Sequence, residues 1–336
     1  MRILLASDHR YPAFGTIGSG LHPRTYPSGS GYWIHDMLMK GLAELGHEVF
    51  YFLPEGAAVP LPPGATLVSR PVWDCDILHT ISDRYPHLIR EWEERGKPWV
   101  ATCHIDMRTV GMPQRVTTDN WIFVSRTLAR LHGRTRYVLN GIDPDTCIYS
   151  EQKQDYFLFM SSMDWEMKKG LDIALSLAAR HGIRLVVAGT GNNYKRIMRI
   201  TSLCREIGAE YVGDVRGLRK AELLAGAKAF LFPTRVDEAF GLGMVEALMS
   251  GTPVICSDNG ACPEIITRDV GFVCRYERDY LNAIRRIGEI SPKTCREKAM
   301  RDYHYLRMAK DYVTEYEQEI LAADKRRSTQ ISVNPR

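Results

Sequence analysis

The sequence predicts an α/β protein built from two parallel-sheet units in tandem. Short apolar runs alternate with stretches of helical periodicity along most of the chain, which is typical of parallel strands joined by crossover helices. This alternation stops in a polar segment at 144–154 and then begins again. The chain has 336 residues, which is long for a single core and suits two domains of roughly 150 residues each.

The first unit is predicted to span residues 1–145. An apolar run at 2–7 indicates a buried strand, and the helical pattern at 32–47 contains Gly46 where a helix would end. Further strands are expected at 48–54, 76–80, 99–104, 121–125 and 136–143.

The second unit is predicted to span residues 146–300. A final helix is expected at about 300–322, and residues 323–336 are expected to form a loose tail. Helical stretches separate the strands of this unit, which are expected at 155–162, 184–190, 210–215, 229–234 and 253–258.

Composition excludes several classes of protein. The formal net charge of +4 is far from the charge density of a dedicated nucleic-acid-binding protein, so no specific nucleic-acid binding is expected. The eight cysteines are scattered without a C-x-x-C pair, which favours reduced thiols in a cytosolic protein. The chain shows neither the pattern of a signal peptide nor an apolar window long enough to cross a membrane.

Glycines after the first strand form a candidate phosphate site. Ligands of open parallel sheets bind beyond the carboxyl ends of the strands, and Gly29 and Gly31 stand just before the helix at 32–47. Backbone can approach a phosphate there, although a flexible turn explains the same residues. Position 34 is Ile34 and no acidic residue ends the second strand, which argues against a nicotinamide-dependent dehydrogenase.

Histidines and lysines also follow predicted strands. His104 and His79 stand at strand ends, and each has a structural role as its alternative. Lys168 and Lys169 precede a helix, where a cation is unfavourable unless an anion offsets it. We therefore expect these lysines to reach a diphosphate, with a solvated pair as the alternative.

Two further short motifs have different interpretations. Gly189 and Gly191 follow a strand of the second unit and suit close approach by a ligand. Asp74 and Asp76 resemble an acidic metal motif but come directly before a strand, so a turn is expected there and no metal site is predicted.

The most specific segment is EAFGLGMVE at 238–246. Glu238 is expected on a loop, while Gly241 and Gly243 flank a helix start where free amides can meet phosphate oxygens. Glu246 falls about one turn into the helix, where its two oxygens can accept both hydroxyls of a ribose. Glu238 would then reach the hydroxyls of a second sugar. The helix dipole alone can explain Glu246, but it explains neither Glu238 nor the glycines.

With these residues the sequence resembles glycosyltransferase family 4, whose members have the GT-B fold of two Rossmann-like domains facing across a cleft. The family pattern of two glutamates separated by seven residues stands here in 238–246. The resemblance covers nearly all of 1–320 and is strongest in the second unit. It also implies that the final helix, at about 300–322, packs back on the first unit. Other motifs fall in the family's order: NGID (140–143), KKGLD (168–172), VAGTG (187–191) and YVGDV (211–215).

The resemblance implies a retaining transfer of sugar from a nucleotide-diphosphate sugar, without a metal or other cofactor. Glu238 would hold donor-sugar hydroxyls, Glu246 the ribose and Lys169 the diphosphate. His104 would lie near the reaction centre and Val215 near the nucleobase. The backbone expected to face the phosphates and the sugar belongs to Gly29, Gly31, Phe240, Gly241, Leu242 and Gly243.

The chain departs from the family at one position. Family members have Gly-Arg after the first strand of the second domain, and Ser161 and Ser162 stand here instead. Lys168 or Arg235 is expected to supply the missing positive charge. If neither does so, the diphosphate is held weakly, and the protein is then a weakly active or non-catalytic nucleotide-sugar-binding protein.

We therefore expect a hexosyltransferase-type enzyme that uses a UDP-sugar and an unidentified acceptor, in the cytoplasm or peripherally at a membrane. A nucleotide-sugar epimerase is an alternative, although such an enzyme is not expected to carry the two-glutamate motif. Arginines clustered at 126–136 suggest contact with an anionic membrane or acceptor, with a solvated face as the alternative. These arginines are Arg126, Arg130, Arg134 and Arg136.

Overall fold

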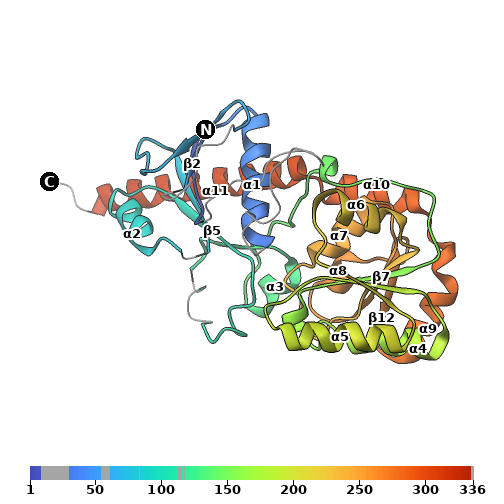
Figure 1. Cartoon of the computed structure of the whole chain (residues 1–336). Helices are drawn as coiled ribbons and strands as arrows, with labels where there is room; N and C mark the ends of the chain where they lie inside the picture. The colour runs from blue at the N-terminus through green and yellow to red at the C-terminus, as the bar shows by residue number, and fades with distance from the viewer. Residues whose placement is uncertain (9–29, 54–60, 83, 113–115, 117, 334–336) are drawn as a thin grey trace. The chain divides into compact units, whose positions relative to one another are not determined.

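The computed structural model describes residues 1–8, 30–53, 61–82, 84–112, 116 and 118–333 (Figure 1). The described residues up to Ile142, together with those from His304 onward, form one compact unit, called unit 1. Residues Asp143–Tyr303 form unit 2. Each unit has its own six-stranded parallel sheet, which confirms the predicted α/β class.

Unit 1 is a parallel sheet with the spatial order β3-β2-β1-β4-β5-β6. Every residue of β4 and β5 is buried, as expected for central strands of a sheet covered on both faces. The strands are β1 (Arg2–Ala6), β2 (Glu48–Phe52), β3 (Ala65–Val68), β4 (Ile77–Ile81), β5 (Trp99–Cys103) and β6 (Trp121–Phe123). The helices are α1 (Ser30–Glu44), α2 (Pro86–Glu94), α3 (Arg126–Leu131) and α11 (Tyr305–Val333).

Helix α1 ends where the sequence predicts. Gly46 has a φ of +84°, which a glycine adopts without strain, and its amide donates to the Ala43 carbonyl at 3.0 Å. The next amide, that of His47, donates to the Leu42 carbonyl at 3.1 Å. These two bonds satisfy carbonyls at the end of the helix and turn the chain into β2.

Unit 2 is a second parallel sheet with the spatial order β12-β11-β10-β7-β8-β9. Its apolar core includes Phe159, Leu185, Leu231 and Ile255. The strands are β7 (Phe157–Met160), β8 (Leu185–Ala188), β9 (Glu210–Gly213), β10 (Ala229–Phe232), β11 (Val254–Ser257) and β12 (Gly271–Cys274). The helices are α4 (Leu171–His181), α5 (Tyr194–Glu206), α6 (Gly217–Gly226), α7 (Leu242–Met249), α8 (Cys262–Ile265), α9 (Glu277–Arg286) and α10 (Pro292–Asp302).

The two sheets share one topology. In each, the first strand of the unit lies between the second and the fourth, so the strand order reverses direction beside it. These reversal points lie between β1 and β4 in unit 1 and between β7 and β10 in unit 2. In open parallel sheets such points form a crevice at the carboxyl ends of the strands, where ligands bind.

The chain passes between the units at two places that lie together within unit 1. Ile142 and His304 form an isolated parallel bridge, and the Tyr305 amide donates to the Ile142 carbonyl at 3.1 Å. A Cβ added at Gly141 would come within 2.7 Å of the His304 carbonyl oxygen, so only glycine fits beside this bridge. The strand predicted at 136–143 is therefore wrong, because Tyr137 and Ile142 make isolated bridges instead of a sheet strand.

The end of the chain also differs from the prediction. The expected start near 300 falls inside α10, and the final helix begins at Tyr305 and continues to Val333. Most of the predicted loose tail at 323–336 is thus helical. Lysines and arginines favour helix here, and neither glycine nor proline interrupts the segment before Pro335. Helix α11 packs against α1 and crosses it (Figure 1).

Candidate functional site

Lys169 and Glu238 meet at the strand reversal of unit 2. Lys169 lies on the loop after β7 and Glu238 on the loop after β10. The Lys169 ammonium contacts Oε1 of Glu238, and the Thr234 hydroxyl donates to the same oxygen at 3.1 Å. The Glu238 side chain is only 11% exposed, so its charge needs this cation. Two predicted site residues that are 69 positions apart are thereby brought together.

Two glycines that sequence reasoning did not assign allow these loops to approach. A Cβ on Gly170 would lie 2.0 Å from the Pro233 carbonyl oxygen, and one on Gly260 would lie 2.1 Å from the Glu238 amide nitrogen. Both glycines have positive φ, at +79° and +57°. The Asn-Gly pair at 259–260 was a turn signal in the sequence, but nothing local indicated that this turn packs on Glu238.

Glu246 is oriented from a different helix. Gly241, with a φ of +90°, precedes the first turn of α7, and Glu246 is the fifth residue of that helix. The Lys220 ammonium, on α6, contacts Oε1 of Glu246. The Glu246 side chain is 12% exposed. Sequence reasoning missed Lys220, because its partner lies 26 residues away on another element.

The candidate substitutes for the missing arginine have different surroundings. The Arg235 guanidinium donates to both carboxylate oxygens of Asp172 at 2.6 and 2.7 Å, and this pairing raises the arginine pKa. Lys168 lies with its Nζ 4.5 Å from the centre of the Trp165 ring. Ser162 accepts a hydrogen bond from the Asp164 amide at the start of a short 3-10 helix. Arg235 therefore forms an ion pair with Asp172, while Lys168 contacts the exposed side chain of Trp165.

Gly189 and Gly191 have a packing explanation within unit 2. A Cβ on Gly189 would lie 1.8 Å from the Ser161 carbonyl oxygen, and one on Gly191 would lie 2.6 Å from Oδ1 of Asp164. Both glycines let the loop after β8 fit against the loop after β7. Val215 precedes α6 with a buried side chain, and Phe240 and Leu242, which flank Gly241, are buried and half-buried. Gly243 packs on the Phe230 ring, where an added Cβ would approach to 3.3 Å.

In unit 1 the structure brings Gly31 and His104 together. A Cβ on Gly31 would come within 3.2 Å of the His104 ring, so the glycine gives the imidazole its space. Burial lowers the pKa of His104 to about 4, so the ring is neutral at pH 7. Its Nε2 is buried and has no hydrogen-bond partner among the described residues. Gly29 lies outside the described residues.

His79 has a structural role inside unit 1, which was the alternative to a functional one. Its Nδ1 is 2.6 Å from the Tyr316 hydroxyl, and its Nε2 is 2.6 Å from the Thr102 hydroxyl. Burial lowers the pKa of His79 to about 3. The His35 ring lies beside both histidines, with its centre 5.0 Å from that of His79 and 5.7 Å from that of His104.

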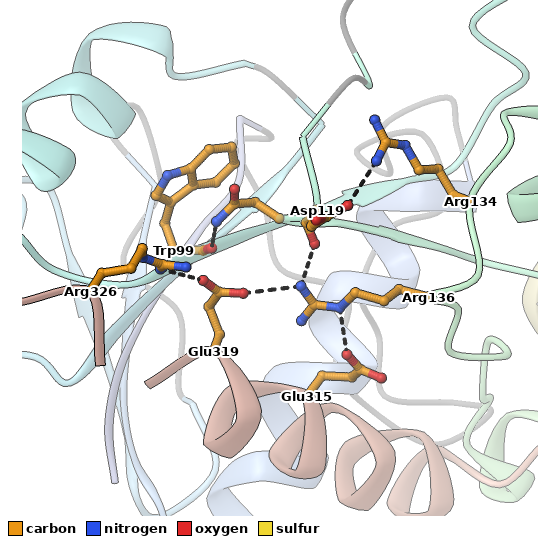
Figure 2. A network of polar contacts seen from close by, with 8 residues as sticks. Trp99, Asp119, Arg134, Arg136, Glu315, Glu319 and Arg326 are labelled. Atoms are coloured by element: carbon orange, nitrogen blue, oxygen red, sulfur yellow. Dashed lines mark hydrogen bonds and ion pairs between the residues drawn. The ribbon is translucent and has the colours of Figure 1, made fainter. Parts of the chain in front are cut away.

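Most of the arginines at 126–136 take part in contacts within unit 1. Arg126 donates to the Tyr137 hydroxyl, and Arg134 donates to Asp119. Arg136 donates to Glu315 at 2.8 Å and to Glu319 at 3.0 Å on α11 (Figure 2). These contacts give three of the four arginines a structural explanation.

The remaining sequence predictions concern Asp74 and Asp76, metal ligands and membrane-spanning helices. The Arg2 side chain contacts Asp74, and the Arg2 amide donates to the Asp76 carboxylate at 2.7 Å. Within the described ranges, no three His, Cys, Asp or Glu side chains come together as a set of metal ligands. None of the helices described has the length and apolar character needed to cross a membrane.

Residues 148–303 match the family model of glycosyl transferases group 1. Among curated proteins, an uncharacterised glycosyltransferase of Methanocaldococcus jannaschii is 27% identical over 171 residues, which are 44% of this chain and 42% of that protein. The phosphatidyl-myo-inositol mannosyltransferase of Mycobacterium tuberculosis is 24% identical over 64% of this chain and 67% of its own length. The chain spans less than half of the length of the Methanocaldococcus protein that it matches.

Solved structures resemble the whole chain. A glycosyltransferase involved in avilamycin A biosynthesis is 25% identical and superimposes with a TM-score of 0.72 over 96% of this chain and 98% of its own. The Anabaena protein HepE in complex with UDP-glucose is 12% identical, with a TM-score of 0.68 over 95% of this chain and all of its own. Together with the two parallel sheets, these likenesses confirm the GT-B fold expected from the sequence.

Proposed function

We propose that this group 1 glycosyltransferase transfers a sugar from a nucleotide-diphosphate sugar to an acceptor hydroxyl, with retention at the anomeric carbon. The observation that carries the proposal is the contact between Lys169 and Glu238 at the strand reversal of unit 2, within the matched domain. A UDP-sugar is the donor we propose. The complex of the Anabaena structural neighbour with UDP-glucose supports this choice.

The residues around Glu238 suit a sugar diphosphate. Lys169 and Thr234 occupy Oε1 of Glu238, so Oε2 can accept sugar hydroxyls. An ammonium has three donors, so Lys169 can hold Glu238 and a phosphate oxygen together. The amides at the start of α7, after Gly241, add positive partial charge for the leaving diphosphate. Lys168 is the second cation that we propose for this charge.

The reaction that we propose is a direct transfer on one face of the sugar. The bond from the anomeric carbon to the phosphate oxygen breaks as the bond to the acceptor oxygen forms, and the leaving phosphate takes the acceptor's proton. We assign no side chain as a nucleophile and no metal to this step. His104 contributes a neutral imidazole that can hydrogen bond near the sugar, because its burial keeps it uncharged at pH 7.

The acceptor and the location belong to the same proposal. We propose an acceptor hydroxyl on a glycan, a glycolipid or a small natural product, and a cytoplasmic enzyme that works free or at a membrane surface. The mycobacterial relative is named as a phosphatidyl-myo-inositol mannosyltransferase, and the structural neighbour is described as involved in avilamycin A biosynthesis. These two names support different acceptor classes, so the acceptor stays open.

A screen of nucleotides and nucleotide sugars by thermal shift tests the donor. UDP and a UDP-sugar should raise the melting temperature, because a ligand that binds only the folded state stabilises it. Glu246→Ala should abolish most of this shift. Glu222→Ala is the matched control, since Glu222 is exposed on α6 and should leave the shift intact. A full shift in the Glu246→Ala protein would contradict the role of this carboxylate.

A second candidate function is nucleotide-sugar binding without catalysis. Ser162 favours it, because this residue caps a short helix where the family has an arginine. An active enzyme should slowly hydrolyse its donor without an acceptor and release UDP. Binding of a UDP-sugar with no release of UDP over hours would favour the binding protein over the transferase.

A further inference from the structure

Glu246 forms an ion pair before any nucleotide binds. The Lys220 ammonium contacts Oε1 of Glu246, and their side chains are 30% and 12% exposed. Of the described residues, Lys220 is the only cation within ion-pair distance of Glu246. Lys220 is the fourth residue of α6, so a helix other than the one that carries Glu246 holds its carboxylate in place.

We propose that Lys220 is a positioning residue for Glu246 and that the pair sets the preference of the donor site for a ribonucleotide. This inference rests on the proposed function, since it assumes that Glu246 accepts the ribose hydroxyls. The substrate feature that it addresses is the 2′,3′-diol of the donor nucleotide. The proposed preference depends on neither the nucleobase nor the transferred sugar.

The geometry suits a vicinal diol. With Oε1 taken by Lys220, the carboxylate cannot rotate freely, and Oε2 presents a fixed acceptor. A ribose hydroxyl both donates and accepts hydrogen bonds. One hydroxyl can therefore donate to Glu246 while it accepts from one of the remaining Lys220 protons. A 2′,3′-dideoxyribose lacks both hydroxyls and would leave both partners unsatisfied.

The surroundings of Glu246 make Lys220 necessary. Cys147 lies close enough to act on Glu246 electrostatically, but burial raises the pKa of this thiol to about 12 and keeps it neutral. Without Lys220, a nearly buried carboxylate would have no cation among the described residues, and it would rotate toward water. Helix α6 also begins two residues after Val215. The short segment 215–220 therefore carries both Val215, which is expected near the nucleobase, and Lys220.

Isothermal titration calorimetry, which measures the dissociation constants of UDP and of 2′,3′-dideoxy-UDP, tests the inference. We expect the natural protein to bind UDP about tenfold or more tightly than the dideoxy analogue, as for hydrogen bonds to a charged group. Lys220→Met should reduce this ratio to nearly that of Glu246→Gln. Lys220→Met combined with Glu246→Gln should reduce it no further, because the two residues act as one unit. GDP and its dideoxy analogue replace the uridine pair if the donor screen returns GDP.

A control variant separates positioning from a general loss of charge or stability. Lys228 pairs with the exposed Asp155 at 2.6 Å, so Lys228→Met removes a cation from the same unit and should leave the ratio unchanged. The inference is overturned if Lys220→Met weakens both nucleotides equally, or if the natural protein binds both equally well. If the natural protein binds neither nucleotide pair, the proposed function itself fails.

Discussion

The Glu238 carboxylate has a cation partner before any sugar arrives. Lys169 neutralises it, and Thr234 fixes the same oxygen, so the acid is held in one orientation at little electrostatic cost. This pairing leaves no net charge between the two residues to attract a diphosphate. The net positive charge that attracts the proposed donor then comes from Lys168 and from the amides that begin α7, while Lys169 still has protons to donate to a phosphate oxygen of the bound donor. Ser161 and Ser162, which stand after β7, supply no positive charge of their own.

His104 is kept neutral by burial, which has a consequence for stability. Its folded pKa of about 4 lies below the ordinary histidine value near 6.5, because a buried imidazolium is poorly solvated. Between these pH values the unfolded chain binds the proton and the folded chain does not. The stability associated with the neutral ring is therefore complete above pH 6.5 and is lost as the pH falls toward 4.

We predict that His104→Gln reduces the acid sensitivity of unit 1. Between pH 7 and pH 4, the natural protein should lose about 3 kcal/mol more unfolding free energy than the variant does, as the pKa difference requires. Urea unfolding followed by tryptophan fluorescence measures this loss, because five of the six tryptophans lie in unit 1. Equal losses in the two proteins would show that His104 titrates normally.

Helix α11 is attached to unit 1 by buried charge as well as by apolar contacts. Arg136 joins Glu315 and Glu319 on α11, and its guanidinium also donates to the Asp119 carbonyl (Figure 2). Arg326 contacts the second oxygen of Glu319. The Glu319 side chain is 7% exposed, so removal of Arg136 leaves a nearly buried carboxylate with a single partner.

Arg136→Met should destabilise unit 1 by about 2 kcal/mol, the range for hydrogen bonds to charged groups. Arg90→Met is the matched control, since Arg90 is exposed on α2 and its guanidinium hydrogen bonds to His87, its one side-chain partner among the described residues. The control should change stability by less than about 0.5 kcal/mol. Urea unfolding of both variants, read by tryptophan fluorescence, gives the comparison. Equal effects would mean that the helix is held by its apolar face alone.

Elements with local signals were predictable from the sequence, and elements defined by distant partners were not. The period of apolar residues placed most strands, and Gly46 marked the end of α1 by its own backbone preference. The two-glutamate motif placed Glu238 and Glu246 because its residues are contiguous. Lys220, Thr234 and Gly260 matter through contacts that only folding creates. The pairing of Arg235 with Asp172 was not predictable for the same reason, because Asp172 is distant in sequence and adjacent in space.

The whole molecule combines two units whose cores are separate. Residues of unit 2 such as Phe159 and Leu231 form their own cluster, and each unit has a complete sheet. The tryptophans divide unevenly between the units, with Trp165 alone in unit 2. Optical probes can therefore report on the two units individually.

Saturating UDP should stabilise unit 2 more than unit 1. At about 100 times the dissociation constant, a ligand adds about 2.7 kcal/mol to the state that binds it. In a Trp165→Phe protein, fluorescence reports unit 1 alone, while far-ultraviolet circular dichroism reports both units. We expect UDP to raise the melting transition seen by circular dichroism more than the one seen by fluorescence. Equal shifts would contradict binding confined to unit 2.

The bridge between Ile142 and His304 has a consequence for how such a chain can change. The polypeptide leaves unit 1 and re-enters it at neighbouring points, with the Tyr305 amide hydrogen bonded to the Ile142 carbonyl. The segment 143–303 is thus inserted into unit 1, and the two ends of the insertion lie next to each other. A short linker that joins Ile142 to His304 should therefore connect the two parts of unit 1 without changing the path of its backbone. Exchange of this segment would then replace unit 2 and leave the backbone of unit 1 in place.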